Sequence, residues 1–412
     1  MTQHSDPVIF EGARVILPDG LAQVSVRVEN GQISAIGGPR DGARVVDIGG
    51  MILAPAMVDV HGDAFERQIM PRPGVTIPID AALLETDRQL AANGIGTAYH
   101  ALTLSWEPGL RSVETGWQVH EALLRLAPRL TVEHRLQLRW ETFCAEALPL
   151  IDAALTNPLT PAVAFNDHTT MGLLHPDVPL QDRPFDHDPG ILIADIESPA
   201  FAAKMEGRAK RSGMSNADFV ALIASVWQRR TRVPGWISAV AAKASAAGAP
   251  MLSHDDTQEQ TRSYYRQLGS DITEFPMNLC TARFARAGGD AIIFGAPNAA
   301  RGGSHLGSVG AADMVRQGLC DILASDYYYP AMLSAVARLA TDGIGTLDAL
   351  WPLVAGNAAR ALRLSDRGQI LPGLRADLVV LDWPPDMVPV VRQTWVNGLC
   401  AYESRPKSVT VS

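Results

Sequence analysis

His61 and Asp63 are the two residues whose types and spacing first indicate chemistry in this sequence. They end the run Val-Asp-Val-His-Gly-Asp at positions 58–63. If residues 57–61 form a strand, both side chains project to the same side of it, because strand side chains alternate with a period of two. An imidazole and a carboxylate placed in this way can bind one metal ion together.

Four further candidate ligands follow apolar or strand-like runs farther along the chain. They are Glu141, His168, His254 and Asp326. A single His-X-Asp pattern is common by chance, but a series of such residues at strand ends is not. Imidazole and carboxylate ligands suit zinc, manganese, iron or nickel, and a carboxylate can bridge two ions. The sequence therefore predicts a divalent metal centre of one or two ions, with zinc as the first choice.

Each of these candidates also has a structural alternative. Glu141 could form a salt bridge with an arginine of its own strand, and Asp326 could cap a helix after a strand. His168 and His254 could be core histidines, or could be oriented by neighbouring carboxylates such as Asp255. These alternatives stay open at the level of the sequence.

A glycine-rich loop downstream offers groups that can bind an anion. It consists of Arg301, Gly302, Gly303, Ser304 and His305. Glycines allow backbone N–H groups to turn toward an anion, and an arginine offers two parallel donors to a phosphate or phosphonate. Beside a metal site we expect this loop to bind substrate, together with Arg72, which prolines flank. An ordinary glycine loop and a structural turn at Arg72 are the alternatives.

Strand-like and helix-like runs alternate from residue 54 onward, which predicts parallel βα units. Eight candidate strands cover residues 56–61, 96–104, 135–141, 162–168, 250–254, 271–275, 291–295 and 321–325. We therefore expect an α/β chain with a distorted TIM-type (β/α)8 barrel over residues 55–364. Active sites of such barrels lie at the carboxyl ends of the strands, where the candidate ligands fall.

The long segment 169–248 leaves the numbering of the strands open. A further strand could lie at residues 191–196, while residues 175–189 are rich in Pro and Asp and predict a loop or lid. Short strands separated by turns are expected at both ends of the chain, over residues 8–10, 14–17, 22–29, 32–36, 373–382 and 390–397. The two ends, residues 1–54 and 365–412, are expected to form one small β-sandwich domain.

The composition of the chain excludes several classes of protein. Of its 412 residues 47% are hydrophobic and 19% charged, and the formal net charge is -9. A chain with a net negative charge is repelled by nucleic acid and by an anionic membrane, so neither is expected as a partner. The start of the sequence lacks signal-peptide order and no apolar run approaches a membrane span, which predicts a cytoplasmic protein. The oligomeric state stays open, with a homodimer as one option.

The four cysteines, Cys144, Cys280, Cys320 and Cys400, lie far apart and have no Cys-X-X-Cys spacing. This pattern predicts scattered thiols rather than a disulfide framework or a cysteine zinc site.

Taken in order, several motifs resemble the amidohydrolase superfamily and, more narrowly, its phosphonate-metabolism branch. They are Met-Pro-Arg-Pro-Gly at 70–74, Glu-His-Arg-Leu-Gln-Leu-Arg at 133–139, Asp-His-Thr at 167–169, Ser-His-Asp-Asp at 253–256, Gly-Ala-Pro-Asn at 295–298, Asp-Ile-Leu-Ala-Ser-Asp-Tyr at 321–327 and the closing segment 368–382. The resemblance implies the same six metal ligands, with Asp63 in place of a second His. It also implies that Glu141 holds the bridging position of a carboxylated lysine.

The resemblance further implies a reaction. The expected substrate is a phosphorylated small molecule, the 5-triphosphate of ribose 1-methylphosphonate, which metal-activated water would cleave to the 5-phosphate and pyrophosphate in the carbon-phosphorus lyase pathway. Asp326 is the expected proton acceptor, and His254 is the second catalytic candidate. One alternative is hydrolysis of a C–N bond in an amide or cyclic amide. Another is a non-catalytic component of the phosphonate machinery.

Overall fold

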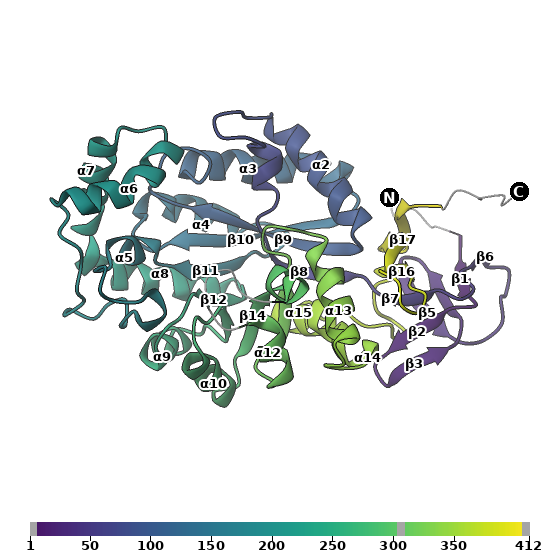
Figure 1. Cartoon of the computed structure of the whole chain (residues 1–412). Helices are drawn as coiled ribbons and strands as arrows, with labels where there is room; N and C mark the ends of the chain where they lie inside the picture. Colours follow the sequence, from purple (N-terminus) through teal and green to yellow (C-terminus); the bar gives the residue numbers. More distant parts are fainter. Residues whose placement is uncertain (1–5, 303–309, 406–412) are drawn as a thin grey trace, which may run out of the picture.

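Eight parallel strands form the central sheet of the computed structural model, which describes residues 6–302 and 310–405 (Figure 1). Their order in space follows their order in the chain: β8 (Met57–Gly62), β9 (Ile95–Leu104), β10 (Glu133–Glu141), β11 (Ala162–Asn166), β12 (Met251–His254), β13 (Ile272–Glu274), β14 (Ala291–Gly295) and β15 (Ile322–Ala324). A bridge between Gly62 and Asp326 joins the first strand to the last. The sheet therefore closes into a TIM-type barrel, as predicted.

The barrel interior is filled by small and branched side chains that alternate along the strands. Val58, Val60, Ala162 and Ala164 are buried there, and Tyr99 is the largest of the group. The opposite faces of the strands pack against the surrounding helices, so both faces of each strand are covered. This explains why the predicted strands are continuous apolar runs.

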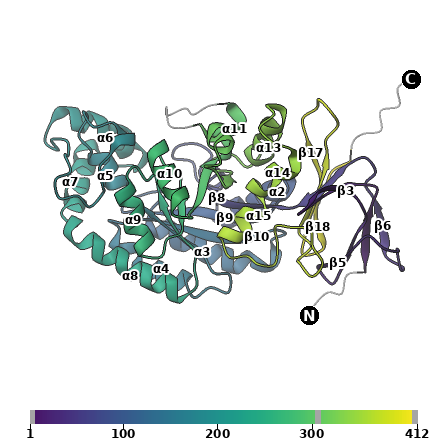
Figure 2. The same cartoon turned by 90° about the horizontal axis from the view of Figure 1, so that it is seen from below.

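Helices follow most of the strands and cover the outside of the barrel (Figures 1 and 2). The helices are α1 (Glu66–Ile69), α2 (Ile79–Ala92), α3 (Val113–Leu126), α4 (Leu148–Ala154), α5 (His168–Leu173), α6 (Pro199–Arg211), α7 (Asn216–Trp227), α8 (Val233–Ala246), α9 (Glu259–Gln267), α10 (Leu279–Ala287), α11 (Ala296–Arg301), α12 (Ala311–Arg316), α13 (Ala331–Thr341), α14 (Leu347–Leu350) and α15 (Gly356–Ala361). Several start at a side-chain cap. Ser112, for example, accepts a hydrogen bond from the backbone N–H of Thr115 at the start of α3.

All eight predicted barrel strands are confirmed, but the possible additional strand at 191–196 is wrong. That segment contains a single bridge, between Ile193 and Leu174. The reason is that β11 pairs directly with β12, which leaves no free edge between them for another strand. The segment 175–189 is a loop with one short 3-10 turn, Leu180–Asp182, as predicted.

Both ends of the chain form a smaller unit of two sheets (Figure 2). One sheet has the order β18-β17-β16-β7-β2-β3 and the other β5-β4-β1-β6. The strands are β1 (Val8–Glu11), β2 (Arg14–Leu17), β3 (Gly20–Gln23), β4 (Val26–Glu29), β5 (Gln32–Ile36), β6 (Arg44–Asp47), β7 (Ile52–Pro55), β16 (Leu378–Asp382), β17 (Val390–Val396) and β18 (Leu399–Glu403). A buried core that includes Phe10 and Trp395 joins the two sheets. The predicted β unit from both ends is therefore confirmed, whereas its boundaries stay a prediction.

The expected single strand over residues 22–29 is wrong. The chain instead forms β3 and β4, which belong to different sheets. Residues 24 and 25 carry the chain from one sheet to the other, so the alternating pattern continues across a break in the hydrogen bonding.

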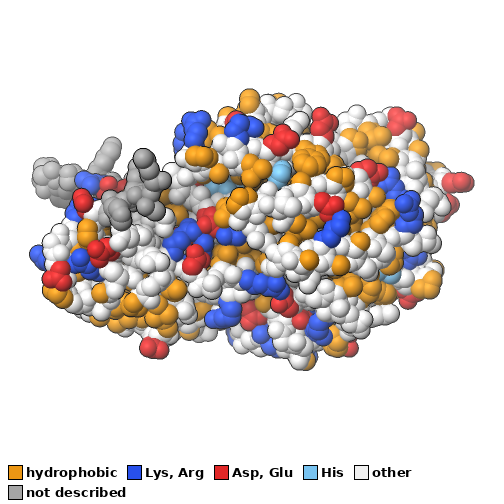
Figure 3. Space-filling model, turned by 180° about the vertical axis from the view of Figure 1, so that it is seen from behind, with side chains coloured by type: hydrophobic (Ala, Val, Ile, Leu, Met, Phe, Trp, Pro, Cys, Tyr) orange, Lys and Arg blue, Asp and Glu red, His pale blue; other side chains and the backbone are white. Residues whose placement is uncertain are grey.

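The surface carries both signs of charge. On the face in Figure 3, Lys and Arg side chains are interspersed with Asp and Glu side chains. Within residues 6–302 and 310–405, no helix is long and apolar enough to cross a membrane. The four cysteines are free thiols, as the sequence predicts.

Candidate metal centre

The candidate ligands gather at the carboxyl ends of the barrel strands. His61 lies at the end of β8, Glu141 ends β10 and His254 ends β12. Asp63 directly follows β8, and Asp326 lies two residues after the end of β15. Because all eight strands are parallel, these ends share one mouth. The prediction that β11 extends to residue 168 is wrong: β11 stops at residue 166, and the next ligand candidate is the first residue of α5.

Three overlapping groups of side chains at this mouth have the residue types and spacing of a metal site. The groups are His61, His254 and Glu274; His168, His254 and Asp255; and His61, Asp63 and Asp326. Within each group the ligand atoms lie within 4.8 Å of one another. Five of the six predicted ligands are therefore brought together, and we call the seven residues of the three groups the ligand ring.

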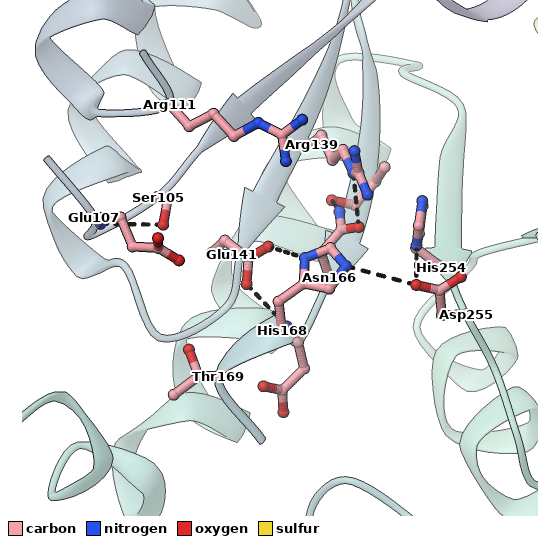
Figure 4. Close-up of polar contacts among 12 residues, drawn as sticks. Ser105, Glu107, Arg111, Arg139, Glu141, Asn166, His168, Thr169, His254 and Asp255 are labelled. Atoms are coloured by element: carbon pink, nitrogen blue, oxygen red, sulfur yellow. Dashed lines mark hydrogen bonds and ion pairs between the residues drawn. The ribbon is translucent and has the colours of Figure 1, made fainter. Parts of the chain in front are cut away.

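Glu141, the sixth predicted ligand, contacts the ring through His168 (Figure 4). Its Oε1 lies 2.5 Å from Nδ1 of His168, and its Oε2 accepts the backbone N–H of His168 at 3.0 Å. Burial would raise the pKa of Glu141, but His168 and Arg139 outweigh burial and lower it to about 2. Glu141 therefore orients His168 as an ionised carboxylate. Its own role as a bridging ligand stays a prediction.

Glu274 is a member of the ligand ring that the sequence interpretation missed. It is fully buried, with Oε1 3.0 Å from His61 Nδ1 and Oε2 3.7 Å from His254 Nε2. Gln137 donates to Oε1 at 2.9 Å and fixes the carboxylate. The signal was available, because Glu274 lies one residue before the end of the predicted strand 271–275 and ends the observed strand β13.

Asp255, which the sequence interpretation assigned only an orienting role, lies between two histidines. Its Oδ2 is 3.0 Å from His254 Nδ1 and 3.6 Å from His168 Nε2. Its backbone is in the left-handed region, with φ 57°, which turns the side chain back toward the mouth. The carboxylate can therefore either orient the two imidazoles or bind a metal ion between them.

Buried polar atoms of the ligand ring test whether a metal ion fits. Nδ1 of His61, both ring nitrogens of His254 and Oε2 of Glu274 are buried, and none of them has a correctly oriented hydrogen-bond partner in the described part of the chain. Such atoms are costly to bury unless a ligand satisfies them. Imidazole nitrogens and carboxylate oxygens are ligands of divalent ions such as zinc. These residues therefore fit a divalent metal ion.

The protonation of the ring reflects its crowded carboxylates. Burial, reinforced by Asp63 and Glu274, raises the pKa of Asp326 to about 6. Burial lowers the pKa of His254. For His61 burial acts in the same direction, but the Glu274 carboxylate outweighs it and the pKa is raised. Divalent ions would balance the negative charge that these carboxylates bring together.

The predicted substrate-binding loop is only partly described. Arg301 ends α11 and Gly302 follows with φ 80°, and both are exposed. Gly303, Ser304 and His305 lie outside the described residues. Arg72 is exposed in a turn that bridges to Val75. Within residues 6–302 and 310–405, no hydrogen bond or ion pair joins Arg72 or Arg301 to the ligand ring, so the substrate-binding roles of Arg72 and of the whole loop stay predictions.

A closed (β/α)8 barrel with imidazole and carboxylate side chains at its mouth is the arrangement expected of a metal-dependent barrel hydrolase. Two solved structures show the same fold, with a TM-score of 0.61 each. Molinate hydrolase is 14% identical and matches 96% of this chain and 95% of its own. L-Hydantoinase (dihydropyrimidinase) from Arthrobacter aurescens is 15% identical and matches 96% of both chains.

A curated relative shows to which branch of the superfamily the chain belongs. The alpha-D-ribose 1-methylphosphonate 5-triphosphate diphosphatase of Escherichia coli (strain K12) is 30% identical over 380 residues, which cover 90% of this chain and 94% of that protein. No protein-family model matches the chain. The chain belongs to the phosphonate-metabolism branch of the amidohydrolase superfamily, and it is a hydrolase. The family predicted from the sequence motifs is thereby confirmed.

Proposed function

We propose that the protein hydrolyses alpha-D-ribose 1-methylphosphonate 5-triphosphate to the 5-phosphate and pyrophosphate. The observation that carries the proposal is the ligand ring, whose buried imidazole and carboxylate atoms lack correctly oriented hydrogen bonds within the described residues and fit divalent ions. The substrate is inferred from the relative that matches 90% of the chain. The ring supports metal-dependent hydrolysis, and the relative supports this particular triphosphate.

Divalent ions bound at the ring would neutralise phosphoryl charge and lower the pKa of the attacking water. The residues that would hold them are His61, Asp63, His254, Glu274 and Asp326, with His168 and Asp255 in the group that also contains His254. The chain itself supplies the groups that move a proton and hold the geometry.

Asp326 is the group we assign as proton acceptor. Its carboxylate lies beside Asp63 and His61 in one of the three groups. Burial raises its pKa to about 6 when no ion is bound, and a carboxylate beside a bound ion is placed to accept a proton from the water. Two backbone hydrogen bonds hold it in place: its N–H donates to His61 O, and its C=O accepts from Asp63 N–H, each at 2.9 Å.

His254 is the second residue to which we assign a catalytic role. Its ring is shared by two of the three groups, and Asp255 lies 3.0 Å from its Nδ1. Burial lowers its pKa, which favours the neutral imidazole with a free lone pair. A neutral imidazole can bind a metal ion or accept a proton.

Phosphorus NMR of the metal-loaded protein with this triphosphate tests the proposal. We expect pyrophosphate from the wild type, none above background from His254→Ala, and wild-type turnover from the matched control His175→Ala. His175 lies in the 175–189 loop with a side chain 40% exposed. A protein with full metal content that releases no pyrophosphate but hydrolyses an amide or cyclic amide would contradict the proposal. A protein that binds no metal and turns over neither kind of substrate would support the non-catalytic alternative.

A further inference from the structure

Arg139 places a buried guanidinium beside the ligand ring (Figure 4). It lies on β10 two residues before Glu141, so both side chains project from the same face of the strand into the mouth. The residue is 8% exposed. A buried cation at the rim of a metal site calls for an explanation, since it opposes the binding of positive ions.

The guanidinium of Arg139 is held at one end only. Its Nε donates to Oδ1 of Asn166 at 3.2 Å, and the Asn166 amide is itself fixed because Nδ2 donates to Ala164 O at 3.1 Å. Within the described residues this is the only hydrogen bond of the guanidinium. The nearest carboxylate contact, from Nη1 to Asp63 Oδ2, is 3.9 Å, which is too long for a hydrogen bond.

The N–H groups of both Nη atoms of Arg139 therefore make no hydrogen bond within the described residues. Neither is among the buried polar atoms without a partner in residues 6–302 and 310–405, and the Arg139 side chain keeps 10% exposure to solvent. A guanidinium carries its N–H donors in a planar fork that matches two oxygens of a phosphoryl group. The orientation set by Asn166 presents that fork to whatever occupies the mouth.

Arg111 brings a second guanidinium to the same place. Its Nη2 lies 3.8 Å from Asp63 Oδ2, so Arg139 and Arg111 both approach the same carboxylate oxygen. Glu66 accepts from Nε at 3.0 Å and from Nη2 at 2.8 Å and fixes the side chain. Figure 4 shows both arginines pointing toward the same part of the site. With its side chain 44% exposed, Arg111 lies nearer the solvent than Arg139.

We infer that Arg139, with Arg111 at the rim, forms a phosphoryl-binding subsite next to the ligand ring. The inference rests on the proposed function and specifies how a polyphosphate substrate is held. Divalent ions neutralise the carboxylates of the ring, and the two arginines then meet an anionic phosphoryl group beside those ions. A neutral amide substrate has no group that would use this fork.

Calorimetric titration of inorganic pyrophosphate into the metal-loaded protein tests the subsite without relying on turnover. We expect Arg139→Met to weaken pyrophosphate binding by roughly 10- to 100-fold, because hydrogen bonds to a charged group are lost. Arg139→Lys keeps the charge but not the fork, and should recover part of the affinity. The control Arg88→Gln removes an arginine on α2 whose side chain is 72% exposed, and should bind like the wild type.

Metal content and thermal stability of each variant are measured alongside. If Arg139→Met does not fold, Arg139→Lys and the rim variant Arg111→Gln decide the question, since each should still weaken binding severalfold. Unchanged pyrophosphate affinity in Arg139→Lys and Arg111→Gln would overturn the subsite. So would an equal loss of affinity for malonate, a dicarboxylate, because the site would then recognise carboxylates.

The failure of this inference is distinguishable from the failure of the proposed function. Pyrophosphate binding that depends on Arg139 in a protein with no triphosphatase activity would support the subsite and contradict the assigned reaction. If Arg139→Met hydrolysed the triphosphate with an unchanged KM, the assigned reaction would be supported and the phosphoryl-binding subsite would be contradicted.

Discussion

Glu274 faces two imidazoles at once, with one carboxylate oxygen 3.0 Å from His61 and the other 3.7 Å from His254. It has no exposure to solvent, and its Oε2 has no hydrogen-bond partner in the described part of the chain. A buried carboxylate next to two buried imidazoles is stabilised when a divalent ion binds all three. We therefore expect Glu274 to be required for metal binding.

Glu274→Gln keeps the shape of the side chain and removes its charge. We expect metal affinity to fall by about 10- to 100-fold, measured as metal bound per chain after equilibrium dialysis. The surface variant Glu85→Gln should retain the wild-type content, because its side chain is 46% exposed in an ion pair with Arg88. Glu141→Gln, measured in the same way, tests whether the carboxylate that orients His168 is also needed for metal binding. Wild-type metal content in Glu274→Gln would contradict the assignment.

Most residues of the ligand ring could be predicted from the sequence, but Glu274 was not. His61, Asp63, His254 and Asp326 could be predicted because each ends or follows an apolar strand. Glu274 satisfies the same condition in a strand of three residues, Ile272–Glu274, and was not recognised. Whether a strand-end side chain turns into the barrel depends on the register between neighbouring strands, which the local sequence does not contain.

At the scale of elements, β10 joins the barrel to the C-terminal segment through its first residue. Glu133 lies 2.9 Å from Arg367 and 2.6 Å from Arg135, and it also contacts Arg375. Burial would raise the pKa of Glu133, but the arginines outweigh it and lower the pKa to about 2. The side chain of Arg367 is only 4% exposed, so this ion-pair group is largely withdrawn from water.

Glu133→Gln should destabilise the protein by roughly 2 kcal/mol at pH 7, because Arg367 and Arg375 lose a charged acceptor while Asp366 still pairs with Arg367. Urea unfolding measures the difference. Since the pKa of Glu133 in the folded protein, about 2, is below its ordinary value of 4.5, its contribution to stability is present above pH 4.5 and is lost as the pH falls toward 2. The difference in the free energy of unfolding between wild type and Glu133→Gln should therefore become smaller as the pH is lowered from 4.5 toward 2.

The matched control for this ion-pair group is Glu146→Gln. Glu146 pairs with Arg229 at 2.8 Å, but its side chain is 55% exposed. Exposed pairs contribute up to about 1 kcal/mol, so this variant should stay close to wild type. A Glu133→Gln protein as stable as Glu146→Gln at pH 7 would show that β10 is not anchored in this way.

The same scale explains which elements the sequence could predict. The eight barrel strands were recognisable because each is buried on both faces and stands between helical runs. The predictions at 191–196 and 22–29 failed because β11 and β12 leave no edge for a further strand, and because the chain changes sheets between β3 and β4. Both failures concern pairing between distant segments, which an alternating pattern alone does not determine.

At the scale of the whole molecule, the ligand ring lies across the seam where the barrel closes. β8 and β15 meet through the single bridge between Gly62 and Asp326, rather than through an extended ladder. Asp59 adds two hydrogen bonds across the seam, from the Ser325 N–H at 3.0 Å and the Ser325 hydroxyl at 2.5 Å. His61 and Asp63 stand on one side of this seam and Asp326 on the other.

A divalent ion bound by His61, Asp63 and Asp326 would therefore join the first and last strands of the barrel. Removing it with a chelator should lower the melting temperature by several degrees, because a ligand that binds only the folded chain at about 100 times its Kd contributes about 2.7 kcal/mol. Hydrogen exchange should locate the effect. Amides of β8 and β15 should lose more protection than those of β9 and β10, which pair along eight residues.

Adding back zinc, manganese, iron or nickel one at a time would then show which ion restores both the melting temperature and the protection of the seam. Protection lost evenly across all eight strands would mean that the ion stabilises the barrel as a whole and not its closure. Protection unchanged after complete loss of metal would mean that the Gly62–Asp326 bridge and the Asp59 hydrogen bonds close the barrel without it. In that case the ligand ring would have a role in catalysis only, and its position across the seam would not affect the stability of the barrel.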